Sequence, residues 1–174
     1  MITNAAPRIA AGTYRIDPDR STVQFRVTHS FGLGPVDGTF TVHDGEITVA
    51  DDPTESTVRV RLDAASFRTD KPRRDTDVTA KRFLNAEAFP LMEFASTAVV
   101  RTGERWELHG RLTVRGVTAP VVLHLASGAA TADGCRFTAT VRIDRYAHRV
   151  GIRGIVARFL DAQIDVVATT TATT

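Results

Sequence analysis

The sequence predicts an all-β domain of short antiparallel strands, arranged as a barrel or a sandwich. Apolar and polar residues alternate strictly in several separate runs, as they do in strands that have one buried and one wet face. These runs are too short to be helices, and they number about eight. Strong turn signals punctuate several of them. A regular series of amphipathic antiparallel strands is typical of a barrel or a sandwich.

The first strong alternation covers residues 21–31 and ends on an unexpected residue. Val23, Phe25 and Val27 alternate with polar residues and share one face. His29 falls on the same face, just before the loop at residues 32–35. Two interpretations of His29 stay open. It is either a partly buried histidine bonded to a backbone carbonyl or an acidic neighbour, or a polar group on the wall of an apolar cavity.

The strands that follow are justified in the same way. Residues 36–49 are predicted to form a hairpin whose turn is Asp44-Gly45. The predicted inward residues of the later strands are Val58, Val60 and Leu62, then Trp106, Leu108, Leu112 and Val114, then Val121, Leu123 and Leu125, then Phe137, Ala139, Val141 and Ile143, and finally Leu160, Ala162, Ile164 and Val166. We see no linker or internal repeat between them.

One segment lacks alternation. Residues 75–85 are predicted to form a short helix capped by Asp75, and Pro90 then precedes a further strand at residues 91–96. Both ends of the chain have the composition of frayed tails. We therefore divide the chain into a flexible tail at residues 1–12, a single β domain at residues 13–169 and a C-terminal tail at residues 170–174.

The composition is that of one soluble globular domain with a proper hydrophobic core. Of 174 residues, 43% are hydrophobic and 24% are charged, and the formal net charge is only +2 although the sequence pI is about 9.1. The arginines are spread through the chain, so no nucleic-acid partner is expected. Cys135 is alone, which excludes an intrachain disulfide and a Cys-rich zinc site.

Residues 1–16 contain no apolar run of signal-peptide length, and no stretch approaches the roughly 20 apolar residues of a membrane span. As written, the protein is expected to stay in the cytoplasm, with at most transient contact with membranes. A wrongly assigned start codon could hide an export signal. A homodimer is left open.

No standard catalytic motif is present, because the chain lacks a Gly-rich phosphate loop, a G-x-S-x-G elbow and an H-E-x-x-H helix. Its five histidines also lack close metal-ligand spacing. His43, His109 and His124 fall on the polar sides of their strands, where surface imidazoles are expected. We therefore expect no enzyme, no metal site and no required cofactor. Two rivals stay open: an enzyme that uses His29 with an acidic partner on a small substrate, and a stress-related interaction module whose outer face acts and whose barrel is filled.

Four stretches resemble the YceI-like family: "YRIDPDRSTVQFRVTHSFGLGPVDGTF", "RRDTDVTAKRFLNAEAFPLMEFAS", "GRLTVRGVTAPVVLHL" and "IDRYAHRVG". They follow one another in the family's order and span nearly the whole chain. In the first stretch the matching positions are Tyr14, Ile16, Asp17, Pro18, Ser21, Val23, Phe25, Val27, His29, Gly38 and Phe40. The chain departs from the family at Arg20, where a His is common, and at Asp77, Ala80 and Arg82, where members often carry His, Ser and Asp.

The resemblance implies an eight-stranded, antiparallel, lipocalin-like β-barrel with a short helix between strands. It also implies a lumen that binds a long isoprenoid chain, such as a polyprenyl phosphate or the tail of an isoprenoid quinone. Barrels of about eight strands are either filled by side chains or hold one small ligand. The residues expected to contact the lipid are Phe25, Val27, His29, Phe40, Val60, Leu62, Phe94, Leu112, Leu123, Phe137, Val141 and Ile143.

Overall fold

The computed structural model describes residues 8–28, 34–151 and 156–171. Their strands are β1 (Gly12–Ile16), β2 (Thr22–Val27), β3 (Val36–Phe40), β4 (Val42–Val49), β5 (Thr57–Asp63), β6 (Leu91–Thr102), β7 (Arg105–Val114), β8 (Val117–Ala130), β9 (Gly134–Asp144) and β10 (Phe159–Thr170). Their helices are the single-turn 3-10 helices η1 (Pro53–Glu55) and η2 (Ala64–Ser66) and the α-helix α1 (Pro72–Thr79).

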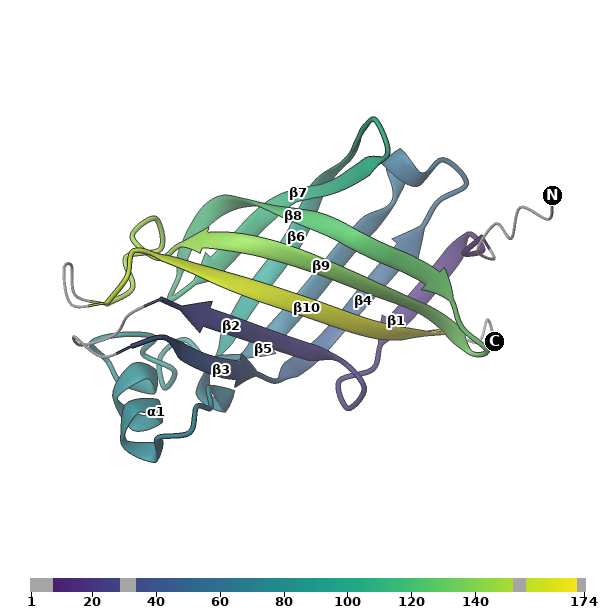
Figure 1. Cartoon of the computed structure of the whole chain (residues 1–174). Helices are drawn as coiled ribbons and strands as arrows, with labels where there is room; N and C mark the ends of the chain where they lie inside the picture. Colours follow the sequence, from purple (N-terminus) through teal and green to yellow (C-terminus); the bar gives the residue numbers. More distant parts are fainter. Residues whose placement is uncertain (1–7, 29–33, 152–155, 172–174) are drawn as a thin grey trace.

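Eight of these strands close into an antiparallel barrel in the order β1, β4, β5, β6, β7, β8, β9 and β10, and the pairing of β10 with β1 completes the circle. The hairpin β2–β3 extends the sheet, because β10 pairs with β2 through residues 161–165 and with β1 through residues 168–170. At one end of the barrel β1 begins and β10 ends, and α1 lies at the opposite end (Figure 1). The predicted eight-stranded barrel with one short helix is confirmed.

The expected turn at Asp44-Gly45 is wrong, because β4 runs straight through both residues. Asp44 lies opposite Arg61 of β5 and forms an ion pair with it. Gly45 is required by close packing: a Cβ at this position would lie 2.5 Å from Cδ1 of Ile16, which is buried. Asp44 and Gly45 therefore lie within one continuous strand, where Asp44 pairs with Arg61 of β5 and Gly45 packs against Ile16 of β1.

The expected helix boundaries are also wrong, because α1 begins at Pro72 and ends at Thr79. Proline is favoured in the first turn, where its missing N–H costs nothing, so the helix begins before Asp75. Asp75 lies inside that first turn and is buried, and its carboxylate accepts hydrogen bonds from the backbone N–H and the hydroxyl of Thr69 at 2.9 and 2.7 Å. The chain leaves the helix at Ala80, whose backbone is extended.

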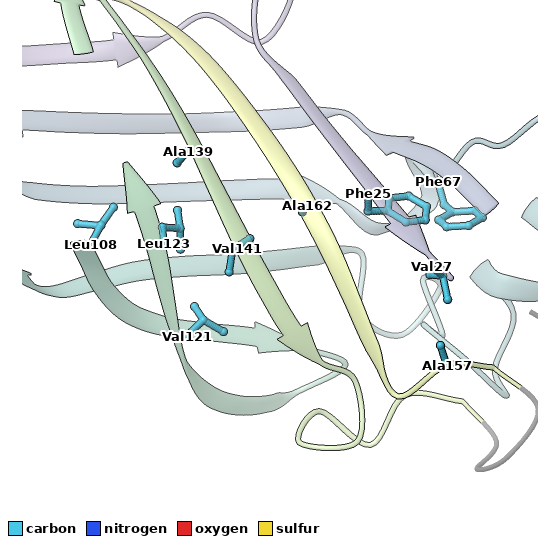
Figure 2. Packing of buried hydrophobic residues seen from close by; sticks show 10 residues of the cluster. All are labelled: Phe25, Val27, Phe67, Leu108, Val121, Leu123, Ala139, Val141, Ala157 and Ala162. Atoms are coloured by element: carbon cyan, nitrogen blue, oxygen red, sulfur yellow. The ribbon is translucent and has the colours of Figure 1, made fainter. Parts of the chain in front are cut away.

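The edge of β3 that faces away from β2 is partly covered by the segment after η2. Thr39 and Arg68 exchange two backbone hydrogen bonds of 2.8 and 3.1 Å. Beneath them, the rings of Phe25, Phe40 and Phe67 pack with centroids 5.1–5.5 Å apart. Figure 2 shows Phe25 and Phe67 beside each other. This aromatic cluster packs the wall near the α1 end, where the sheet would otherwise present an open edge.

Arginine–aspartate ion pairs join neighbouring strands on the outer face of the barrel. They are Arg26–Asp37, Arg61–Asp44, Arg136–Asp165 and Arg142–Asp161. In each pair the guanidinium holds the pKa of the carboxyl below its usual value through a charged hydrogen bond. A carboxyl whose pKa is lowered by folding stabilises the fold above its unfolded pKa, and this stabilisation is lost as the pH falls through the folded pKa.

We therefore expect the free energy of unfolding to fall as the pH is lowered from 5 towards 2. Asp161→Asn should make this decline shallower, because one of the paired carboxyls no longer titrates. The effect is expected to be small, since both side chains are solvent-exposed. Urea unfolding at a series of pH values measures it. Asp19→Asn is the control, because that exposed carboxylate pairs with none of the described side chains; an equal change in both variants would contradict the prediction.

Candidate functional site

The inward side chains of the barrel enclose one continuous cavity of about 620 Å³, which we call the lumen. All ten described strands contribute to its wall, and nearly all of the contributing side chains are aliphatic or aromatic. This volume lies in the range of small-molecule binding sites. The strand alternation explains its apolar lining, because every second residue of each strand must point inwards.

The structure places most of the predicted ligand contacts on the lumen wall. The ten that line it are Phe25, Phe40, Val60, Leu62, Phe94, Leu112, Leu123, Phe137, Val141 and Ile143. Val27 instead lines a smaller neighbouring cavity of about 110 Å³, beside Phe67. His29 lies outside the described residues. The role of these residues as ligand contacts stays a prediction.

Several inward side chains are only half-buried although they point into the barrel. Val60, Leu62 and Phe94 on β5 and β6 are of this kind, and so are Phe137 and Ile143 on β9. In a close-packed interior such residues lose nearly all of their accessible surface. Their remaining accessibility shows that the side chains do not fill this part of the barrel.

The lumen is open to solvent at the end where β1 begins. There its lining includes Arg8, Pro53 and Glu104, which are exposed, together with the partly buried Ile9 and Trp106. We call this opening the mouth. Arg101 stacks over the ring of Trp106, with the guanidinium carbon 5.4 Å from the ring centroid. The mouth thus combines an apolar inner rim with charged residues of both signs.

At the α1 end the described side chains that line the lumen are mostly buried, and two of them are polar. Arg145 is only 6% exposed. Its Nε, Nη1 and Nη2 donate to the carbonyl oxygens of Ala157, Val150 and Val156 at 2.8, 2.6 and 2.5 Å. The guanidinium carbon also lies 4.7 Å from the ring centroid of Tyr146. Burial lowers the pKa of Arg145, yet a guanidinium stays charged at neutral pH.

His148 is the second buried polar residue at this end and is 2% exposed. Its Nε2 lies 2.9 Å from the carbonyl oxygen of Leu112 on β7, and its Nδ1 lies 3.3 Å from that of Asp144 on β9. Carbonyl oxygens only accept, so the shorter contact favours a proton on Nε2. His148 therefore links the segment after β9 to β7 in the barrel wall, while Arg145 bonds to residues further along the connection between β9 and β10.

Sequence reasoning missed Arg145 and His148 as lumen residues. Arginine is a surface residue by type, and neither position belongs to a strand with clear alternation. The one signal that could have found them is the run "IDRYAHRVG", which the resemblance had already singled out. A family match in this run does not by itself reveal that its two polar residues are buried.

The part of the chain that the structure describes offers little for metal binding or for nucleophilic catalysis. No cluster of three or more His, Cys, Asp or Glu side chains there is arranged to hold a metal ion. Burial raises the pKa of the Cys135 thiol to about 11, so this thiol stays protonated at neutral pH. No described helix has the length and apolar character needed to cross a membrane.

Comparison with known proteins settles the family. A model of the YceI-like domain matches residues 14–172. The chain belongs to the YceI-like family. The resemblance seen in the sequence is thereby confirmed, and this match covers every strand from β2 to β10.

Relatives of this YceI-like chain include a UPF0312 protein of Photorhabdus laumondii, which is 35% identical over 127 residues, or 71% of this chain and 65% of the relative. Protein YceI of Salmonella arizonae is 35% identical over 116 residues, or 65% of this chain and 60% of the relative. The chain thus spans slightly less than two thirds of the length of these relatives.

Several solved structures share the fold of this chain. Burkholderia cenocepacia BcnA matches with a TM-score of 0.76 and 22% identity, covering 88% of this chain and 99% of that one. A polyisoprenoid binding domain from Saccharophagus degradans, implicated in plant cell wall breakdown, matches with a TM-score of 0.66 and 10% identity. That match covers 93% of this chain and all of the other.

Proposed function

We propose that this YceI-like domain binds a long-chain isoprenoid lipid, a polyprenyl phosphate or an isoprenoid quinone, and sequesters or carries it in the lumen. The observation that carries the proposal is the continuous apolar lumen of about 620 Å³, walled by all ten strands and open at the mouth. A structural neighbour that is a polyisoprenoid binding domain supports this choice of lipid class.

Burial of the chain supplies the affinity in this proposal. Each CH₂ group moved from water into the lumen contributes about 0.8 kcal/mol, so each prenyl unit contributes roughly 3 kcal/mol before ordering costs. A few units then give useful affinity without a strong headgroup contact. The protein would distinguish its ligands more by the length and shape of the chain than by the headgroup.

The proposal involves no covalent chemistry. Among the described residues, the charged side chains that line the lumen lie at its two ends, Arg8 and Glu104 at the mouth and Arg145 at the α1 end. Between them the part of the wall that the structure describes is almost wholly apolar, without a pair of groups for acid–base catalysis. Such a wall suits a protein that holds a ligand rather than one that transforms it.

Trp106 provides a direct test, because it is the single tryptophan of the chain and lines the mouth. An isoprenoid quinone is expected to quench its fluorescence in a saturable titration. Prenyl alcohols should compete in order of chain length, and they should compete better than straight-chain alcohols with the same number of carbons. Mass spectrometry of solvent extracts from gently purified protein should reveal a co-purified prenyl lipid.

A preference for straight chains would contradict the isoprenoid proposal and point to a fatty-acid ligand. Protein that is repeatedly free of lipid and that shows no saturable quenching would contradict lipid binding itself. Trp106→Phe is the matched control for the optical signal, because it keeps an aromatic ring at the mouth. This variant should compete for the quinone while showing no quenching.

A further inference from the structure

The residues just before β1 cross the mouth of the lumen. We call residues 8–11 the strap. Ile9 is partly buried, lines the lumen and packs against the apolar cluster formed around β1 and β4. A Cβ at Gly128 would lie 3.7 Å from Cδ1 of Ile9, so the Ile9 methyl group lies over this glycine of β8. In the circle of strands β8 is separated from β1 by β10 and β9. The strap therefore reaches beyond its own neighbours and over the opening.

Two hydrogen bonds hold the strap in this position. Nη2 of Arg8 donates to the carbonyl oxygen of Asp51, in the connection between β4 and β5, at 3.0 Å. The hydroxyl of the buried Tyr14 donates to the carbonyl oxygen of Ala10 at 2.6 Å. The first bond is exposed to solvent, where a hydrogen bond adds little net stability. Segments held by few contacts open locally at low free-energy cost.

We propose that lipid enters and leaves the lumen through the mouth and that the strap is the gate, with Ile9 as the residue that must move aside. This inference rests on the proposed function, since it specifies how the ligand reaches that site. At the opposite end the described lining residues Leu84, Met92 and His148 are buried, so the mouth is the opening that the described residues form.

A gate makes a specific kinetic prediction. A variant that opens more easily should accelerate association and dissociation together, while the equilibrium affinity changes less than either rate. Ile9→Ala removes the side chain that lies over the opening. Tyr14→Phe removes the anchoring hydrogen bond and keeps the buried ring. Loss of one such bond corresponds to roughly a fivefold gain in the open population.

The experiment follows the entrance of N-phenyl-1-naphthylamine, an uncharged apolar dye that fluoresces in dry sites, by stopped-flow mixing with the whole chain. Tyr14→Phe should raise both dye rates by roughly fivefold, and Ile9→Ala should raise both rates as well. Arg15→Ala is the control, because Arg15 is an exposed residue of β1 and is absent from the lumen wall. Val60→Phe, which fills part of the lumen, should remove the dye signal and so assign it to that cavity.

Unchanged dye rates in both strap variants would overturn the gate, and so would an increase shared by Arg15→Ala. A change confined to dissociation would make Ile9 an ordinary contact and overturn it as well. A lumen that admits no dye would also exclude the mouth as a route. Failure of the proposed function looks different: the dye enters with the expected kinetics, yet an isoprenoid quinone does not bind.

Discussion

Val60→Phe is expected to abolish most lipid binding while leaving the lipid-free barrel nearly as stable as the unchanged protein. Val60 points into the lumen and is only half-buried, so a larger ring has space to occupy. Its cross-strand neighbours are Gly45 and Phe94, and of these Phe94 is likewise only half-buried on the lumen wall. If the ring displaces about three CH₂ groups of lipid, the loss is about 2.4 kcal/mol, or roughly 50-fold in Kd.

Two comparisons make this result decisive. Arg59→Phe adds the same ring to the neighbouring exposed position of β5 and should leave lipid binding unchanged. Val141→Phe adds it where the wall is tight, since Val141 is 5% exposed and packs in the main apolar cluster. There we expect a loss of about 1–3 kcal/mol in unfolding free energy. If Val60→Phe is equally destabilised in urea melts without lipid, the barrel is filled and the carrier proposal fails.

The residues of the lumen wall could be predicted because strand alternation is a local property. A period of two fixes which face a residue takes, whatever strand lies beside it. The inward positions predicted for the segments that became β5, β7, β9 and β10 line the lumen for this reason. Alternation does not identify which strands pair with one another. For this reason the hairpin expected at Asp44-Gly45 is wrong.

The glycines in the strands are a second case in which the sequence does not identify the neighbouring residue. A Cβ at Gly110 would lie 2.4 Å from the ring of Phe94, and a Cβ at Gly38 would lie 2.2 Å from the ring of Phe25. Each glycine makes room for an aromatic ring that the neighbouring strand lays over it. A glycine in a strand signals a close approach, but the sequence does not say what approaches. That knowledge depends on the register of the closed sheet.

Arg145 is the clearest case of a residue whose role needs the tertiary structure. Its three donor nitrogens are satisfied by backbone carbonyls that follow it in the chain by five to twelve residues, in a segment without strand alternation. No local sequence pattern predicts such a contact. Once the contacts are known, however, they predict one of the largest stability effects in the protein.

Arg145→Leu is expected to lower the free energy of unfolding by about 3–5 kcal/mol. One buried and two partly buried hydrogen bonds to carbonyl oxygens are lost, at about 1–3 kcal/mol each, and only part of this is regained by relaxation. Arg145→Lys should be intermediate, since one ammonium cannot reproduce the planar fork that reaches all three oxygens. Urea unfolding of lipid-free protein measures both variants. Arg111→Leu, an exposed arginine of β7, is the control and should change stability little.

The same variants separate a structural role of Arg145 from a role in holding the ligand. If Arg145 organises the α1 end, the folded fraction of Arg145→Lys should bind an isoprenoid quinone with unchanged affinity at low denaturant. A variant that keeps its stability but loses affinity would instead make Arg145 a ligand contact. The guanidinium nitrogens already donate to the carbonyl oxygens of Ala157, Val150 and Val156. These three backbone contacts favour the structural role, and in the proposed function the apolar wall is then the part of the lumen that selects the lipid.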